Sequence, residues 1–198
     1  PVAPALEGRD GRLYGTTSYG GPNALGTVFR IDRDGAAYEP LHAFPAFPGD
    51  GYRPASDLLQ DENGVLYGAT SCGGGNELGT VFRVLPDGSD YRILHHFRQT
   101  SPTAVSYGAT VALGCLSGGN LFGVTAALGL QGGGTIFTLN VDGSGHRVLH
   151  EFGPSLEDGF LPVVALLAGG DGALYGATER GGAHGGGTIY RIQPDGSG

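Results

Sequence analysis

The sequence lacks lysine, methionine and tryptophan, and it has only two cysteines among its 198 residues. All 11 basic residues are arginines, and they are outnumbered by 19 acidic residues, which gives a net charge of −8. Nucleic-acid binding needs a basic surface that neutralises phosphates, so this balance argues against it. A membrane-spanning helix needs about 20 consecutive apolar residues, and no run of that length occurs, so we expect no membrane span in this segment.

The absence of methionine also bears on what kind of chain this is. The sequence begins at Pro1 and contains no start residue. We therefore expect it not to be a complete open reading frame. A processed mature protein, a cut fragment and the ordered part of a longer chain all remain open as explanations.

Glycine, by contrast, is abundant, and the 40 glycines fall at fixed phases of a fourfold repeat. The motif Leu-Tyr-Gly, or Leu-Phe-Gly, starts at residues 13, 66, 121 and 174, in steps of 53, 55 and 53 residues. Each copy is followed by a Gly-Thr pair, with the threonines at 27, 80, 135 and 188. A period of about 40–55 residues that contains several short strands is typical of propeller blades.

The second repeat shows how one period divides into four strands, A to D. We expect these strands at residues 55–60, 65–70, 80–85 and 91–97. Asn63-Gly64 and Asp87-Gly88 stand between strand-like runs, and such pairs favour hairpins in which both central residues have positive φ. Ten residues always separate the last threonine of strand B from the Gly-Thr threonine, so the length of the B–C loop is constant.

These patterns predict an all-β fold, a β-propeller built from four repeats with four antiparallel strands per blade. The blade units are approximately 1–44, 45–97, 98–152 and 153–198, and we expect them to form a single array. The sequence ends at Gly198, before a fourth strand D, so the last blade should lack its outer strand. A larger ring, two copies that complete one ring, and closure of four blades alone remain open. We favour a larger chain or self-association.

The predicted strand order places the long B–C and D–A loops on one end face, where propeller-like scaffolds usually carry function. Aromatic side chains on this face could stack on sugar rings or anchor a protein, and two loop aspartates could bind Ca²⁺. Calcium is the only cofactor that we consider. A single loop histidine is a weaker candidate for a metal ligand. These candidates are Tyr19, Phe47, Tyr52, Tyr107 and Phe160, then Asp50 and Asp158, then His184.

Three further histidines, His42, His95 and His150, recur in strand D as Leu-His-x-Phe. A catalytic histidine is normally needed once, so this repetition favours a structural role, such as bonding to a neighbouring strand or loop. No nucleophile elbow, zinc-binding helix or Cys-His arrangement occurs. We therefore favour a protein without enzymatic activity, although a composite catalytic site at the propeller mouth remains an alternative.

The two cysteines occupy different phases of the repeat. Cys72 follows a Leu-Tyr-Gly strand, whereas Cys115 precedes the corresponding strand of the next repeat. In the predicted strand order these phases lie at opposite ends of their blades. A disulfide requires Cα atoms within about 7 Å, so we expect free thiols.

The repeat resembles the bacterial GloVer tandem repeat over essentially the whole chain. The matching motifs are Gly-Thr-Val-Phe at 79–82, Asp-Gly at 87–88, Leu-His-x-Phe at 94–97 and Leu-Tyr-Gly-x-Thr at 66–70. The linking motif Asp-Gly-x-x-Pro occurs at 50–54 and 158–162, but residues 98–104 replace it before the third blade. The resemblance implies a β-propeller in a secreted or cell-surface bacterial protein and brings no known catalytic residues.

The first functional hypothesis is therefore a non-enzymatic extracellular propeller that acts as a structural or protein-binding scaffold and self-associates through its incomplete blade. The first alternative is a surface carbohydrate-binding module that uses the loop aromatics. The second alternative is a lyase or hydrolase with a composite site at the propeller mouth.

Overall fold

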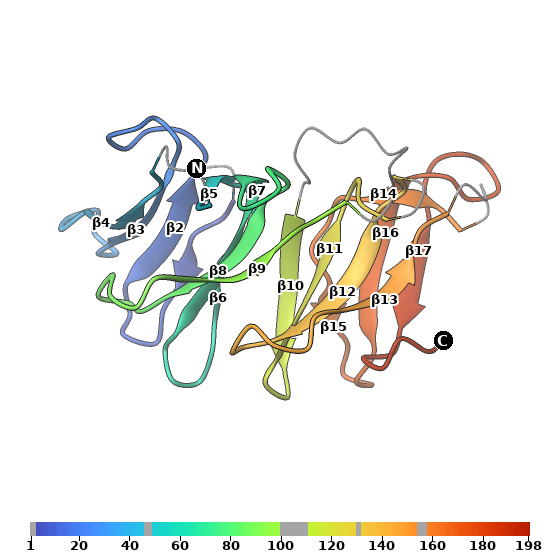
Figure 1. The fold of residues 1–198 in the computed structure, drawn as a ribbon. Helices are drawn as coiled ribbons and strands as arrows, with labels where there is room; N and C mark the ends of the chain where they lie inside the picture. Colours follow the sequence, from blue (N-terminus) through green and yellow to red (C-terminus); the bar gives the residue numbers. More distant parts are fainter. Residues whose placement is uncertain (1–2, 46–48, 100–110, 130–131, 154–157) are drawn as a thin grey trace. The chain divides into compact units, whose positions relative to one another are not determined.

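The computed structural model describes residues 3–45, 49–99, 111–129, 132–153 and 158–198. The chain divides into two compact units, Pro1–Phe97 and Arg98–Gly198. The described residues form strands and turns and contain no helix (Figure 1). The described part therefore contains no helix that is long and apolar enough to cross a membrane.

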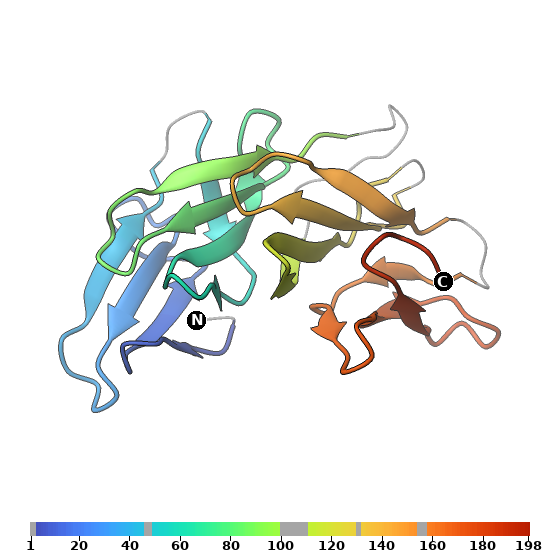
Figure 2. The same cartoon turned by 90° about the horizontal axis from the view of Figure 1, so that it is seen from below.

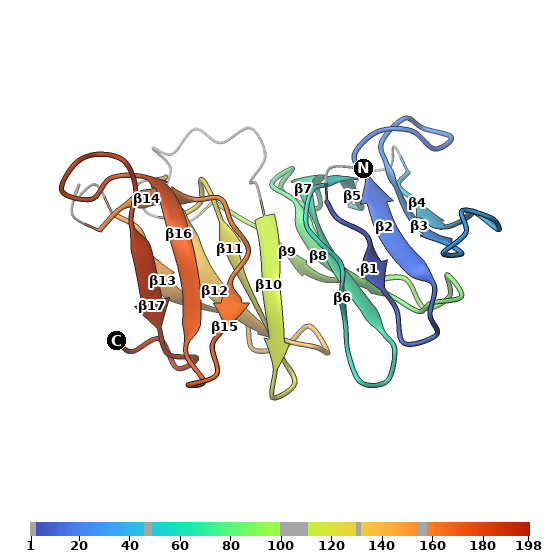
Figure 3. The same cartoon turned by 180° about the vertical axis from the view of Figure 1, so that it is seen from behind.

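The first unit contains two antiparallel sheets, which are the first two blades. The strands follow one another across each sheet, and Figure 3 shows β1 beside β2 and β6 beside β7. The first sheet consists of β1 (Leu6–Glu7), β2 (Leu13–Thr17), β3 (Thr27–Ile31) and β4 (Glu39–Ala43). The second consists of β5 (Gly51–Pro54), β6 (Leu59–Gln60), β7 (Leu66–Gly73), β8 (Thr80–Val84) and β9 (Arg92–His96).

The second unit repeats this plan, but its last sheet is incomplete. Within the described residues β17 pairs with β16 alone, and no strand lies on its other side, as the sequence predicts (Figure 2). The third sheet consists of β10 (Val111–Ser117), β11 (Asn120–Thr125), β12 (Thr135–Asn140) and β13 (Arg147–Glu151). The fourth consists of β14 (Phe160–Pro162), β15 (Leu167–Ala168), β16 (Leu174–Arg180) and β17 (Ile189–Ile192).

Strand A of the second sheet differs from the prediction of one continuous strand over residues 55–60. The structure has two short strands, β5 and β6, that pair with opposite ends of β7. Between them the Ser56 hydroxyl accepts a hydrogen bond of 2.8 Å from the Ala69 amide. A side chain thus replaces a backbone carbonyl in the ladder, which local side-chain bonding of serine permits.

The Asp-Gly turns also differ from the expected geometry. In the turn at Asp87-Gly88 only the glycine has positive φ, at 83°, and the Leu85 amide bonds to the Ser89 carbonyl. This is a three-residue loop in which a type I turn precedes a left-handed glycine. Both central residues have positive φ at Gly118-Gly119, where the hairpin closes between Ser117 and Asn120.

The constant ten-residue spacing has a structural cause. The two threonines that it separates face each other across strands B and C, and their hydroxyl oxygens lie 2.8 to 3.0 Å apart in all four sheets. The glycine before the second threonine, such as Gly79 with φ of 95°, could not carry a side chain because its Cβ would collide with the Thr70 carbonyl. The Gly-Thr motif therefore fixes the register of the B–C hairpin.

Each unit has an apolar core that its two sheets share, and this core covers one face of each sheet. Facing side chains from the paired sheets fill these cores. In the first unit they are Tyr14, Val28, Leu41, Phe44, Leu58, Leu66, Phe82 and Val84. In the second they are Phe122, Val124, Ile136, Phe152, Leu166, Leu174 and Ile192.

Candidate functional site: the junction between paired sheets

The polar residues that recur in the sequence meet where the chain passes from one sheet to the next. Asp50 lies in the loop that connects β4 to β5, and its Oδ2 is 3.3 Å from Nε2 of His42. Its Oδ1 accepts hydrogen bonds of 2.6 Å from the Tyr91 hydroxyl and 2.7 Å from the Gly51 amide. The His42 and Asp50 side chains are only 18% and 14% exposed. We call this group the first junction.

The ring of Tyr91 fills the first junction. It stacks on His42 with ring centroids 3.5 Å apart and planes 7° from parallel. It also contacts Phe44 from the first sheet and Phe82 from the second, with centroids 6.2 and 5.7 Å away. One tyrosine, which directly precedes β9, therefore joins both sheets through ring contacts and one charged hydrogen bond.

The electrostatics of the first junction keep Asp50 ionised. Burial acts to raise the pKa of its carboxyl, but the hydrogen bonds from His42, Tyr91 and Gly51 outweigh burial and lower that pKa below 3.8. Burial raises the pKa of Tyr91 far above its ordinary value, and the bond to Asp50 adds to this effect. At neutral pH the pair is a carboxylate acceptor and a phenol donor.

The rest of the Asp-Gly-x-x-Pro motif also binds the second sheet to the first. Gly51 approaches the Thr70–Thr80 pair so closely that a Cβ would collide with both hydroxyls. The Arg53 amide donates a hydrogen bond of 2.9 Å to the Leu25 carbonyl in the neighbouring B–C loop. Within this motif Gly51 therefore packs against its own sheet, whereas Arg53 and Pro54 bond to the first sheet, Pro54 by accepting a hydrogen bond of 2.7 Å from the Ser18 hydroxyl.

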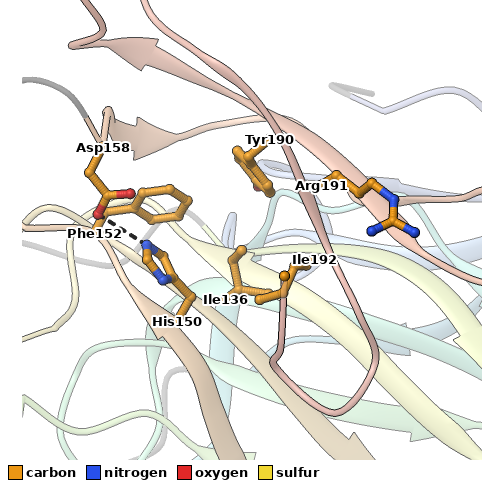
Figure 4. Close-up of a pocket in the computed structure, with 8 residues that line it drawn as sticks. Ile136, His150, Phe152, Asp158, Tyr190, Arg191 and Ile192 are labelled. Carbon is orange, nitrogen blue, oxygen red and sulfur yellow. Dashed lines mark hydrogen bonds and ion pairs between the residues drawn. The ribbon is translucent and has the colours of Figure 1, made fainter.

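The second unit forms a second junction from the same motif positions. Nε2 of His150 is 3.1 Å from Oδ2 of Asp158, and the Leu161 amide donates a hydrogen bond of 2.8 Å to the Gly133 carbonyl. The His150 and Asp158 side chains are 37% and 39% exposed, twice as much or more than their counterparts. Beside them lies a cavity of about 100 Å³ (Figure 4). It is lined by Ile136, His150, Phe152, Asp158, Tyr190, Arg191, Ile192 and Gly198.

Two predicted site residues, Asp50 and Asp158, thus belong to junctions. The structure also shows the expected bonding of His42 and His150 to neighbouring loops. Among the described residues, no three His, Cys, Asp or Glu side chains converge as a metal site would require. Calcium binding at Asp50 or Asp158 stays a prediction, and at Asp50 it would compete with three existing hydrogen bonds.

The other predicted binding residues are not brought together. Tyr19 is 66% exposed, with the Arg53 guanidinium 5.2 Å from its ring centroid. Tyr52 is half-buried and its hydroxyl donates a hydrogen bond to Glu77. The remaining positions differ in their surroundings: Phe160 packs against the second core, His184 is exposed in its loop, and Phe47 and Tyr107 lie outside the described residues. Glycan binding stays a prediction.

Sequence reasoning missed the pairing of histidine with aspartate and the role of Tyr91. One signal was available, because each paired aspartate follows its histidine by eight residues, at 42 and 50 and again at 150 and 158. A second was the position of Tyr91, four residues after the aspartate of the Asp87-Gly88 turn. The two cysteines, Cys72 in β7 and Cys115 in β10, are free thiols in the structure.

The paired antiparallel sheets, joined in sequence by a recurring linker, define a β-propeller repeat protein with four blades. The sequence pattern described as the Gloeobacter/Verrucomicrobia repeat matches residues 1–198, so the chain belongs to that family. This confirms the resemblance that the motifs carry. No curated protein sequence matches the chain.

Solved structures with the same fold are distant in sequence. A chain of a nidogen/laminin complex matches 97% of this chain with a TM-score of 0.61 and 16% identity. A gluconolactonase from Xanthomonas campestris matches 98% with a TM-score of 0.59 and 18% identity, and TolB from Acinetobacter baumannii matches 97% with 0.60 and 13%. The matches cover 64%, 58% and 40% of those chains, respectively. At these identities the likeness shows the fold alone.

Proposed function

We propose that this protein is a non-enzymatic scaffold of paired propeller blades that binds another polypeptide at its incomplete last sheet. One observation carries the proposal: the recurring polar motif residues join neighbouring sheets. His42, Asp50 and Tyr91 bond to one another across the first junction, and neither histidine nor carboxylate is presented to a substrate there. A scaffold needs this arrangement, whereas a catalytic site would leave such groups open to a reacting molecule.

The binding surface in this proposal is the outer edge of β17. Ile189, at the start of that strand, is 87% exposed, and within the described residues no strand covers it. An uncovered strand presents a row of backbone donors and acceptors, and another chain can add a strand there. In the three other sheets a strand D occupies the corresponding place. The edge therefore favours self-association or pairing with another repeat.

The molar mass in solution tests this proposal. We expect the mass measured by light scattering to rise with concentration above the 20.2 kDa of one chain. Ile189→Lys should reduce this rise, because a charge on an edge strand opposes pairing. Val164→Lys is the matched control, since Val164 is 45% exposed, lies outside the strands and should leave association unchanged. A mass of one chain at every concentration would contradict self-association.

An extracellular or cell-surface location is part of the proposal and rests on the family. Cell fractionation of a producing bacterium, followed by detection of this chain, would test it. Recovery from the medium or the cell surface is expected, and recovery from the cytoplasm alone would contradict it.

A further inference from the structure

One exposed surface of the first unit brings together an aromatic ring and an arginine from different blades. Tyr19 belongs to the loop between β2 and β3, and Arg53 belongs to β5, which lies beside that loop (Figure 1). The Arg53 guanidinium lies 5.2 Å from the centroid of the Tyr19 ring, and Tyr19 is still 66% exposed. The guanidinium therefore leaves part of the ring open to solvent. We call these two residues the loop pair.

Backbone contacts hold the segments that carry the loop pair. The Arg53 amide donates a hydrogen bond of 2.9 Å to the Leu25 carbonyl, and the Arg53 carbonyl accepts one of 3.0 Å from the Ser71 hydroxyl. The Ser18 hydroxyl donates a hydrogen bond of 2.7 Å to the Pro54 carbonyl and so ties the first loop to the end of β5. Because these segments are already fixed, a ligand does not have to order them, which lowers the entropic cost of binding.

The fold makes no use of the charge on Arg53. Within the described residues its guanidinium takes part in no hydrogen bond or ion pair. By contrast, Arg12, Arg33 and Arg191 are also partly exposed, and each pairs with a carboxylate. The N–H donors of Arg53 are therefore available to a ligand.

The second unit shows that the loops form without the loop pair. Leu161 has the place of Arg53, with a similar left-handed backbone (φ of 59° against 55°) and the corresponding hydrogen bond to the Gly133 carbonyl. Ala127 has the place of Tyr19, two residues after the last threonine of strand B. Packing of the loops therefore requires neither an aromatic ring nor a charge at these positions. A role in binding accounts for the loop pair better than a role in folding.

The chemistry of the loop pair favours a sugar that carries a carboxylate. A guanidinium binds a carboxylate through two parallel hydrogen bonds. An exposed tyrosine ring offers a flat apolar face, which suits the C–H face of a pyranose. One arginine matches one carboxylate rather than a chain of phosphates, in keeping with the net charge of −8. An acidic peptide could not add a strand at Arg53, because the amide and carbonyl of that residue are already bonded.

We propose that Tyr19 and Arg53 form a binding site for a uronic acid of a short acidic oligosaccharide. The sugar ring packs on the open part of the Tyr19 ring, and its carboxylate accepts hydrogen bonds from Arg53. This activity goes beyond the scaffold function and does not depend on the edge of β17. A long polyuronate should bind less well per sugar than a short one at low salt, because the acidic chain repels it.

A tetrasaccharide of galacturonic acid is the probe, and its methyl ester, in which the carboxylates are neutral, is the matched ligand. Binding of each to the whole chain is measured by NMR titration at equal ionic strength. We expect the acid to bind about tenfold more tightly than the ester, because hydrogen bonds between charged groups have an effect of this size.

Two variants carry the residues that the second unit has at the same positions. Arg53→Leu should abolish the preference for the acid and leave the affinity for the ester nearly unchanged. Tyr19→Ala should weaken the acid and the ester by similar factors, because both present the same ring. Arg33→Leu and Tyr38→Ala are the matched controls, since the Arg33 side chain is 62% exposed and Tyr38 is 55% exposed, and should change neither affinity.

Several outcomes would overturn the site. Equal affinity of the unaltered protein for the acid and the ester would do so, as would the absence of binding by either ligand. A preference for the acid that persists in Arg53→Leu would show that the carboxylate binds elsewhere. A tetrapeptide of glutamate that binds at Arg53 as tightly as the acid would overturn the choice of a sugar. None of these results bears on association through β17, which the molar mass tests separately.

Discussion

The first junction makes a quantitative prediction for Tyr91→Phe. The substitution removes only the hydroxyl that donates 2.6 Å to Asp50 and keeps the ring that stacks 3.5 Å from His42. A hydrogen bond to a charged group contributes about 1.5–3 kcal/mol to stability. The Asp50 side chain is only 14% exposed, so water cannot fully replace the lost donor. We expect the free energy of unfolding of the first unit to fall by about 2 kcal/mol.

Urea denaturation followed by circular dichroism measures this change. Tyr38→Phe is the matched control, because Tyr38 holds the same position in the first repeat but is 55% exposed. A surface substitution of this kind should change the free energy of unfolding by less than about 0.5 kcal/mol. Both variants should leave the slope against urea unchanged, since neither alters the surface that unfolding exposes.

A double-mutant cycle with Asp50→Asn assigns the effect to the pair. If the hydroxyl acts through the carboxylate, Tyr91→Phe should cost much less in the Asp50→Asn background, with a coupling energy of about 1–2 kcal/mol. Two results would refute this account of the junction. One is that Tyr91→Phe is as stable as the unaltered protein, and the other is that the effects of the two substitutions are strictly additive.

Three further predictions concern other parts of the chain. Stability should decline with acid, because the folded-state pKa of Asp50 lies below 3.8: its contribution is present above about pH 4 and is lost as the pH falls through the lowered pKa. In Asp50→Asn the free energy of unfolding, measured at a series of pH values, should depend less on pH below about pH 4. Gly114→Ala should destabilise the second unit by about 1–3 kcal/mol in urea, because its Cβ would collide with the Leu166 backbone, whereas Gly170→Ala meets open space and should not. Tyr190→Phe should leave thermal stability unchanged or raise it, since the Tyr190 hydroxyl is buried without a hydrogen-bond partner among the described residues.

The four-sheet architecture could be predicted from the sequence because the same turn and strand motifs occur in all four repeats. The Gly-Thr pairs mark where strand C begins, and the Asp-Gly pairs mark the C–D turns. For the same reason the sequence predicted that the fourth sheet has no strand D within the described residues. Whether the blades form one array stays a prediction. The division into units falls after Phe97, where the sequence loses Asp-Gly-x-x-Pro.

Details that depend on side-chain bonding were not predictable from these signals. The break in strand A arises because the Ser56 hydroxyl takes a place in the ladder. The strand propensities of these residues do not indicate that a side chain will take the place of a backbone carbonyl in the ladder. The turns were assigned the wrong geometry because Asp-Gly suits both two-residue and three-residue hairpin loops, and only the backbone angles of Asp87 and Gly88 distinguish them.

The candidate site was only half predictable. Asp50 and Asp158 were singled out as carboxylates in long loops, and the histidines as repeated structural residues, but their pairing was not foreseen. The third member, Tyr91, lies 41 residues from Asp50. It reaches Asp50 only because the second sheet packs against the first. Such a contact depends on the packing of whole sheets, which no local pattern in the sequence encodes.

The central claim is that the outer edge of β17 pairs with a strand of another polypeptide, and amide hydrogen exchange tests it most directly. The informative comparison is β17 with β8, which occupies the same place in a complete sheet between β7 and β9. In dilute protein the outward-facing amides of β17 should exchange much faster than those of β8. At concentrations at which the chains associate, the β17 amides should exchange more slowly, whereas those of β8 should not change. Slow exchange of every β17 amide in the monomer would contradict the claim.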